Sequence, residues 1–287
     1  MLKKSGLPPR DEDKDQVQEI IRELDNMIGL ESVKKLIHEL YAFVEIQKKR
    51  EKEKLNTEPL VLHTIFSGNP GTGKTTVARL IGRLYKEMGV LSRGHIVECE
   101  RADLVGEYIG HTANKTRDMV KKALGGVLFI DEAYSLSRGG EKDFGKESID
   151  ALVKAMEDNK EDFILILAGY KLEMEIFVQS NPGLRSRFPI HIVFPDYTLE
   201  ELTDIGEQML ASRQYEFSLE AKHVFKRTIL NMSALYPYAG NARLVRNIVE
   251  KAIRKQAVRL YRQKDLSRED LILITEEDLR QQDSSGA

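Results

Sequence analysis

The sequence predicts an α/β fold, in which a five-stranded parallel sheet is covered by helices and followed by a small α-helical domain. Up to about residue 195, short apolar strands alternate with helix-length segments, a pattern typical of a parallel sheet covered on both faces. After Tyr197 this alternation stops and helical periodicity takes over. A chain of 287 residues is long enough for one large and one small domain.

The expected strands are short, and several are apolar at every position, as strands buried on both faces are. The five expected strands are Val61–Ser67, His95–Cys99, Val127–Asp131, Phe163–Ala168 and Ile190–Phe194. Helices are expected between and after them near residues 74–88, 112–123, 145–158 and 172–179.

The second part of the chain is expected to be helical. Thr198 and Glu201 have the spacing of a capping box, in which the two side chains satisfy backbone N–H groups at a helix start. Further helices are expected at residues 218–235 and 241–263 and after Thr275, and the one candidate strand is Leu271–Ile274.

Composition and charge exclude several classes of protein. The net charge of −2, from 44 basic and 46 acidic residues, gives no general attraction to nucleic acid or to an anionic membrane. No apolar run approaches the roughly 18 residues of a membrane span, and Met1–Arg10 lacks the apolar core of a signal peptide. The single cysteine, Cys99, is expected to be a buried thiol, and the six histidines show no metal-ligand spacing. We therefore expect a soluble cytoplasmic protein.

The segment Gly68–Thr75 reads G-N-P-G-T-G-K-T and matches the phosphate-binding P-loop, or Walker A, pattern. Its glycines allow a tight turn whose N–H groups face one anion. Lys74 can reach the β- and γ-phosphates of a nucleotide, and the Thr75 hydroxyl can bind Mg²⁺. A strand precedes the loop and an amphipathic helix follows it, so a phosphate would lie at a helix N-terminus. The expected ATP-binding residues here are Gly68, Asn69, Pro70, Gly71, Thr72, Gly73, Lys74, Thr75 and Thr76.

Two acids follow the apolar strand that begins at Val127. Asp131 fits the Walker B role, in which a carboxylate at the end of a buried strand supports Mg²⁺. Glu132 is then placed to orient and polarise the water that attacks the γ-phosphate. Many strands end in an acid, so this interpretation depends on the preceding P-loop.

GTP-binding switch proteins are an alternative, because they combine a P-loop with D-x-x-G and N-K-x-D. Asp103–Gly106 and Asn159–Asp162 match those two patterns in that order. However, the guanine-reading motif belongs at the end of a strand, and Asn159 follows a helix and precedes a strand. We interpret both matches as accidental.

Three further segments could carry chemistry or contacts. Arg185 and Arg187 lie in a loop before a strand, where an arginine could stabilise a transferring phosphoryl group or simply lie on the surface. Arg243 opens a helix in the second domain and could reach a nucleotide. Tyr108 and Ile109, between glycines, would be ordinary core if buried and a gripping surface if exposed.

These motifs, in this order, resemble the AAA+ ATPases, and in particular the branch that contains red-type Rubisco activase and stage V sporulation protein K. The resemblance runs from about Glu23 to about Leu260 and is closer to the sporulation protein, notably across Gly139–Glu147. The segments that carry it most specifically are Arg101–Thr112, Phe129–Leu136 and Ala168–Tyr170.

The resemblance implies a homo-oligomeric ring, usually a hexamer, that binds ATP and Mg²⁺ at subunit interfaces and remodels a protein client. It implies that Arg187, with Arg185 as the alternative, is an arginine finger acting on the neighbour's ATP, and that Arg243 is the sensor-2 residue. It also implies a first pore loop at Tyr108, Ile109 and Gly110, and a second pore-facing loop over 138–145. Ile28 and Gly29 fit the adenine pocket.

One position departs from the family pattern. The sensor-1 residue at the end of the fourth strand is commonly Asn in AAA+ proteins, and the matching residue here is Tyr170. A phenol can still hydrogen-bond to the nucleotide, so Tyr170 stays a candidate for that role.

The sequence thus predicts an ATP hydrolase that remodels a client, expected to act in sporulation, with a Rubisco-activase-type chaperone as one alternative. A slow nucleotide switch or scaffold and a DNA-dependent ATPase are the others, and the near-neutral charge argues against DNA. The expected parts of the chain are a disordered tail (1–14), N-terminal helices (15–58), the nucleotide-binding domain (59–195) and the helical lid (196–287).

Overall fold

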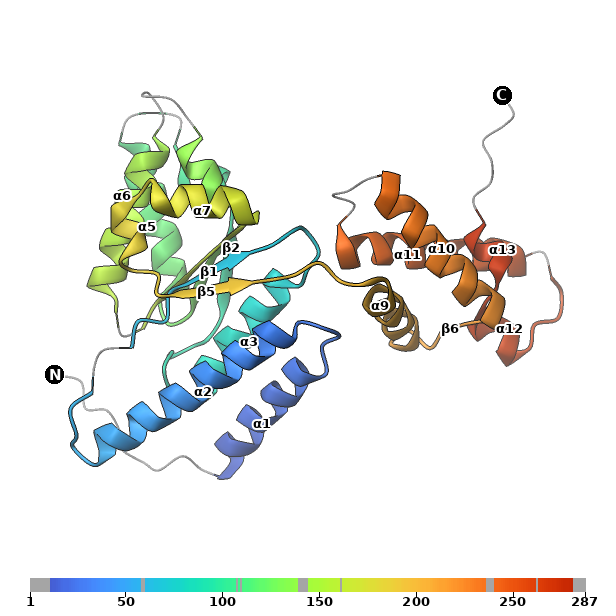
Figure 1. Cartoon of the computed structure of the whole chain (residues 1–287), viewed down its shortest axis with the longest axis horizontal. Coiled ribbons are helices and arrows are strands. Elements are labelled where there is room, and N and C mark those ends of the chain that lie inside the picture. The colour runs from blue at the N-terminus through green and yellow to red at the C-terminus, as the bar shows by residue number, and fades with distance from the viewer. Residues whose placement is uncertain are drawn as a thin grey trace. The chain divides into compact units, whose positions relative to one another are not determined.

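A computed structural model describes residues 11–57, 60–106, 108, 110–138, 144–160, 162–235, 240–261 and 263–280 (Figure 1). These residues form two compact units. The first consists of the described residues up to Gly68 together with Lys74–Phe194, and the second consists of Asn69–Gly73 and the described residues from Pro195 onward. The turn of the P-loop is therefore grouped with the C-terminal helices.

The first unit is built on a five-stranded sheet in the order β2-β3-β4-β1-β5, with every pair parallel. This confirms the predicted fold class. All residues of β1, β3 and β4 are buried, as their apolar sequences indicate. The strands are β1 (Thr64–Ser67), β2 (Ile96–Cys99), β3 (Val127–Ile130), β4 (Ile164–Gly169) and β5 (Ile190–Val193).

The main helices of this unit begin and end within one or two residues of the predicted positions. They are α3 (Lys74–Glu87), α5 (His111–Ala123), α6 (Gly145–Asp158) and α7 (Lys171–Gln179). The sequence analysis missed three short helices, because four or five residues are too few to show a helical period. These are α4 (Arg101–Leu104), the 3₁₀ helix η1 (Ala133–Ser137) and α8 (Pro182–Arg185).

Two N-terminal helices precede the sheet, α1 (Asp11–Asp25) and α2 (Glu31–Lys52). Helix α1 begins at Asp11, so the expected disordered tail of residues 1–14 extends too far, and residues 1–10 lie outside the described part. The acidic sequence at this start suits the positive end of a helix dipole. The predicted break at Ile28-Gly29-Leu30 is confirmed, because Gly29 and Leu30 both have positive φ angles, of 62° and 61°.

The second unit contains α9 (Leu199–Ala211), α10 (Leu219–Leu235), α11 (Asn241–Tyr261), α12 (Arg268–Ile272) and α13 (Glu276–Leu279). The capping box of Thr198 and Glu201 is present as predicted. A short parallel pair joins β6 (Glu216–Phe217) to β7 (Leu273–Ile274). The expected strand over 271–274 is therefore wrong in its first half, which belongs to α12.

The predicted burial of Cys99 is confirmed. Burial raises the pKa of its thiol to about 12, and the carboxylates of Asp103 and Glu100 act in the same direction. Within the described ranges, no helix is long and apolar enough to cross a membrane.

Candidate nucleotide site

The P-loop leaves β1 through a turn in which two glycines have no room for a side chain. A Cβ atom placed on Gly68 would lie 2.4 Å from the carbonyl oxygen of Phe194, and one on Gly71 would lie 2.1 Å from that of Gly240. Gly71 and Gly73 also have φ angles of 75° and 95°, a region that favours glycine. The path of the backbone therefore requires the glycines of the motif.

Positive charge collects where this turn enters α3. Lys74 is buried, and its ammonium group donates to the carbonyl oxygen of Gly68 at 2.8 Å. The first N–H groups of a helix have no acceptor within the helix, and the helix dipole is positive at this end. The turn, the ammonium and the start of α3 thus fit a phosphate group. Of the other residues expected here, Asn69, Pro70 and Thr75 are half-buried, Thr72 is buried and Thr76 is exposed.

The sheet brings the expected catalytic acids to the same edge as the P-loop. Ser67 of β1 pairs with Gly169 of β4, and Ile130 of β3 pairs with Leu167 of β4. Because all three strands are parallel, the residues that follow them share the carboxyl edge of the sheet. Gly68, Asp131, Glu132 and Tyr170 are those residues.

Glu132 has an unusual backbone conformation at this edge. Its φ and ψ angles are 47° and 42°, in the left-handed region that a glutamate seldom adopts. The carboxylate of Asp131 accepts a hydrogen bond from the N–H of Glu132 at 3.0 Å. The Glu132 side chain is exposed. Backbone strain of this kind is found preferentially at functional sites, and here it falls on the residue expected to activate water.

Two tyrosines lie beside these acids. The rings of Tyr134 and Tyr170 are 6.1 Å apart, and Tyr170 precedes the first residue of α7. Burial raises the pKa of Tyr134 to about 12, and the nearby Glu132 carboxylate adds to this. The sensor-1 candidate Tyr170 therefore lies at the end of β4, as its sequence position indicates.

The metal that accompanies a nucleotide would not be held by protein groups alone. Among the described residues, no three or more His, Cys, Asp or Glu side chains form a group that could hold a metal ion. Thr75 and Asp131 supply a hydroxyl and a carboxylate, oxygen ligands of the type that Mg²⁺ prefers. The residues present thus fit a Mg²⁺ ion that is also bound by phosphate oxygens.

Arg187 lies away from this edge. It precedes β5, at the amino edge of the sheet, where its guanidinium forms an ion pair with Glu157 at the end of α6 and donates to the carbonyl oxygen of Gly183 at 2.9 Å. The same contact lowers the pKa of Glu157. Arg185, two residues earlier, is exposed.

The first turn of α11 lies against the turn of the P-loop, within the second unit. The N–H of Ala242 donates to the carbonyl oxygen of Gly71 at 3.2 Å. The side chain of Arg243, the next residue, is exposed. The structure thus brings the backbone of the expected sensor-2 residue close to Gly71.

The remaining expected site residues lie elsewhere in the first unit. Tyr108 is 66% exposed, and its ring meets that of His111 edge-on at 5.5 Å, so it is not a core residue. Gly110 has a φ angle of 79° and open space around it. Ile109, and part of the second expected loop over 138–145, lie outside the described residues. Ile28 and Gly29 are half-buried in the turn between α1 and α2.

The structure also explains the two motifs shared with GTP-binding switch proteins. The carboxylate of Asp103 accepts from the N–H of Glu100 at 2.9 Å, in a capping box at the start of α4. The carboxylate of Asp162 accepts from the N–H and the hydroxyl of Ser92, both at 2.8 Å. Both acids therefore have local structural roles, which supports the interpretation of these matches as accidental.

Sequence reasoning missed two polar residues beside the P-loop, Asp196 and Asn241. Both hydrogen-bond to the turn Asn69–Gly73. Asn241 lies within the G-N-A-R motif, which could have drawn attention to it. Asp196 had no such signal, because its partners are far away in the sequence.

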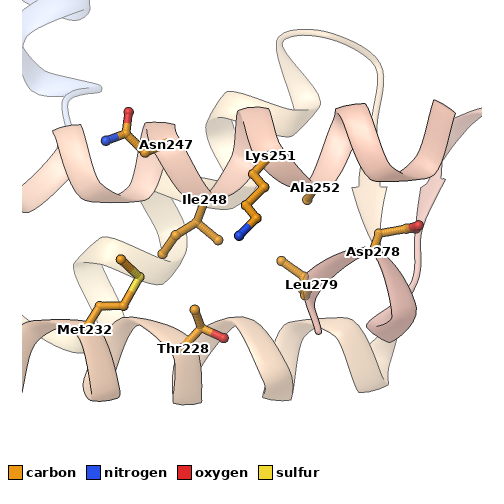
Figure 2. A pocket seen from close by; sticks show the side chains of 8 residues that line it. All are labelled: Thr228, Met232, Asn247, Ile248, Lys251, Ala252, Asp278 and Leu279. Carbon is orange, nitrogen blue, oxygen red and sulfur yellow. The ribbon is translucent and has the colours of Figure 1, made fainter. Parts of the chain in front are cut away.

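Figure 2 shows a separate cavity of about 120 Å³ in the second unit, between α10, α11 and α13. Pockets for small-molecule ligands typically have volumes of roughly 300–1,000 Å³. None of the expected site residues is among those that line it, which are Thr228, Met232, Asn247, Ile248, Lys251, Ala252, Asp278 and Leu279. The P-loop edge is therefore the better candidate for a nucleotide.

Comparison with protein families gives two matches. The model of the ATPase family associated with various cellular activities (AAA) matches residues 64–196, and the model of the AAA lid domain matches residues 198–287. The first match contains the P-loop, both acids of the β3 edge and Arg187. The second contains the first turn of α11.

Several known proteins are similar over nearly the whole chain. Stage V sporulation protein K of Bacillus subtilis (strain 168) is 53% identical over 274 residues, which cover 94% of this chain and 85% of that protein. The chloroplastic ribulose bisphosphate carboxylase/oxygenase activase of Cyanidioschyzon merolae is 45% identical over 268 residues, covering 92% and 91%. Protein CbbX of Cereibacter sphaeroides is 45% identical over 267 residues, covering 92% and 86%.

A solved structure of the Thermotoga maritima RuvB Holliday junction branch migration motor has a TM-score of 0.59 and 22% identity. The match covers 89% of this chain and 69% of that one. At this level of identity the likeness shows the fold alone.

Proposed function

Because the chain belongs to the AAA family of ATPases and hydrolyses ATP, we propose that it works as a homo-oligomeric ring that remodels a partner protein. A hexamer is the expected ring, as the resemblance to AAA+ proteins implies. In this proposal, residues 59–195 form the nucleotide-binding domain, which the helices of residues 15–58 precede, and residues 196–287 form the lid.

Each residue of the carboxyl edge has a role that follows from its chemistry. Lys74 binds the β- and γ-phosphates, and Thr75 and Asp131 bind or support Mg²⁺. Bound Mg²⁺ neutralises the charge that develops on the phosphate oxygens. Glu132 orients and polarises the attacking water, and its exposed carboxylate is accessible for this. Tyr170 hydrogen-bonds to the nucleotide or to this water.

The observation that carries the ring proposal is the position of Arg187. It lies at the amino edge of the sheet, whereas the P-loop lies at the carboxyl edge. The four residues of β5 alone separate these edges by roughly 10 Å. A phosphoryl-stabilising arginine at this place therefore serves the site of a neighbouring subunit better than its own. An arginine supplied in trans is worth about 10³–10⁵ in rate.

Tyr108 supports the second part of the proposal, the grip on a client. An aromatic ring that is 66% exposed and follows Gly106 in a loop is available to bind a peptide. Arg243, which starts α11, is the residue we assign to sensing the nucleotide from the lid. Ile28 and Gly29 are assigned to the adenine pocket.

Two relatives suggest different clients. The identity of 53% to a sporulation protein favours a role in sporulation. The identity of 45% to a Rubisco activase keeps an activase-type chaperone as the second candidate. Growth and spore counts of a deletion strain test the first role, and recovery of inhibited Rubisco by the purified protein tests the second.

The ring is tested by measuring ATP turnover per subunit over a wide range of protein concentration. We expect specific activity to rise steeply with concentration, because each site needs a neighbour. Arg187→Ala subunits mixed into wild type should inactivate their wild-type neighbours, and Arg185→Ala is the matched control, since Arg185 lies two residues away and is exposed. Flat specific activity, with Arg187→Ala acting only as a diluent, would show that each subunit works alone and would favour a slow switch.

A further inference from the structure

Asp196 joins two segments that bind nucleotide in the proposed function. Its two carboxylate oxygens accept from the side-chain amide of Asn69 at 3.0 and 2.9 Å. One of them also accepts from the side-chain amide of Asn241 at 2.9 Å. Hydrogen bonds to an ionised carboxylate are roughly twice as strong as those between neutral groups. The carboxylate thus binds the P-loop turn and the start of α11 together.

Asn241 uses both ends of its amide in the same network. Its nitrogen donates to the carbonyl oxygen of Pro70 at 3.3 Å, and its oxygen accepts from the N–H of Tyr197 at 3.0 Å. Its φ angle is 46°, a left-handed conformation that asparagine adopts more readily than most residues. Asparagine is therefore suited here both by its backbone preference and by its side chain.

Backbone contacts add to this connection. The N–H of Ala242 donates to the carbonyl oxygen of Gly71 at 3.2 Å, and the phenol of Tyr197 donates to that of Thr72 at 3.4 Å. Burial raises the pKa of Tyr197 to about 12, so its phenol keeps its proton at neutral pH. Three consecutive residues of the P-loop turn, Pro70, Gly71 and Thr72, thus have a carbonyl oxygen hydrogen-bonded to residues 197–242.

We propose that Asp196 and Asn241 are positioning residues of the ATP site, which hold the P-loop turn to the first turn of α11 and thereby place Arg243 beside the phosphates. The second half of this inference rests on the role that we propose for Arg243. Helix α11 has its own buried face, at Leu244, Val245 and Val249, which holds it in the second unit without this network. Loss of the network should therefore change nucleotide binding more than folding.

The test measures binding of ATP and ADP and steady-state kinetics for two variants of the full chain. Asp196→Ala removes the carboxylate, and Asn241→Gly removes the amide while keeping a residue that tolerates the left-handed backbone. We expect each to raise the KM for ATP by about tenfold, the change that the loss of one hydrogen bond to a charged group produces. We expect kcat to fall less, and the melting temperature to stay near that of Asp204→Ala, an exposed acid of α9 that serves as the control.

A double-mutant cycle with Arg243→Ala separates positioning from a purely structural role. If Asp196 acts by placing Arg243, the effect of Asp196→Ala on ATP affinity should largely disappear in the Arg243→Ala background. Asp196→Asn, which keeps the shape of the side chain, should show a smaller loss with the same coupling, and it replaces Asp196→Ala if that variant folds poorly.

Two results would overturn the inference. One is wild-type ATP affinity in both Asp196→Ala and Asn241→Gly, which would leave the role of Arg243 untouched. The other is an equal loss of affinity with and without Arg243, together with a lower melting temperature. If instead Arg243→Ala alone has no effect, the proposed role of Arg243 fails, and the placement of that residue fails with it.

Discussion

His63 makes the stability of the sheet depend on pH. It directly precedes β1, is only 6% exposed, and lies near the rings of Phe163 and Phe188 at 6.2 and 6.0 Å. Its Nδ1 accepts a hydrogen bond from the N–H of Leu165 in β4 at 3.0 Å. Burial lowers the pKa of His63 to about 4. The neutral ring fits this site, whereas a protonated ring would set an N–H against the N–H of Leu165.

The magnitude follows from the two pKa values. In the unfolded chain His63 has its ordinary pKa of about 6.5, so the unfolded state binds more protons than the folded state between about pH 6.5 and 4. The stability that this histidine contributes is fully present above pH 6.5 and is lost as the pH falls toward 4. At about 1.4 kcal/mol for each pH unit, the full loss is roughly 3 kcal/mol.

The measurement is urea denaturation followed by circular dichroism, at pH values from 7 down to 4, on wild type and on His63→Gln. Glutamine does not titrate here and has an oxygen that can accept from Leu165. We expect His63→Gln to be less stable at pH 7 but to lose less stability on acidification. Carboxylates also titrate in this range, so the difference between the two proteins isolates the histidine. Parallel pH profiles for the two proteins would refute the reasoning.

Three substitutions test the proposed site itself. Glu132→Gln should bind ATP normally and lose turnover by at least about 10²-fold in single-turnover assays, since the amide cannot act as a base; near-normal hydrolysis would remove Glu132 from its role. Tyr108→Ala should keep assembly and ATPase activity but lose client remodelling, and normal remodelling would exclude a grip by this ring. Gly71→Ala should abolish ATP binding, because its Cβ would lie 2.1 Å from the carbonyl oxygen of Gly240. Gly89→Ala is its control, with a similar φ angle of 67° but its nearest neighbouring atom at 3.9 Å; weak ATP binding there too would assign the effect to backbone strain alone.

The regular elements could be predicted because their signals are local. The apolar run of β4, the one-sided pattern of α3 and the capping box of Thr198 each depend on residues within a few positions of one another. The P-loop and the two acids after β3 were found for the same reason, since their spacing is contiguous. Single-turn elements such as α4 and η1 carry too few residues to show a period, and they were missed.

The contacts that complete the site could not be predicted, because they join residues that are distant in the sequence. Asp196 meets Asn69 across 127 positions, and His63 meets Leu165 across 102. The partner of Arg187, Glu157, lies on another helix 30 positions away. One chain without an alignment shows which residue types are present but not which of them the fold brings together.

The position of the P-loop turn explains how one short segment can serve two functions. Its ends are fixed in the first unit, by β1 before Gly68 and by α3 from Lys74, while its middle is hydrogen-bonded within the second. Any change that a phosphate group makes in this turn must therefore alter hydrogen bonds to Asp196 or Asn241, or move the first turn of α11 with it. An ATPase needs such a connection if the state of its nucleotide is to move a lid, and glycines whose Cβ positions are blocked leave the turn little freedom to respond in any other way.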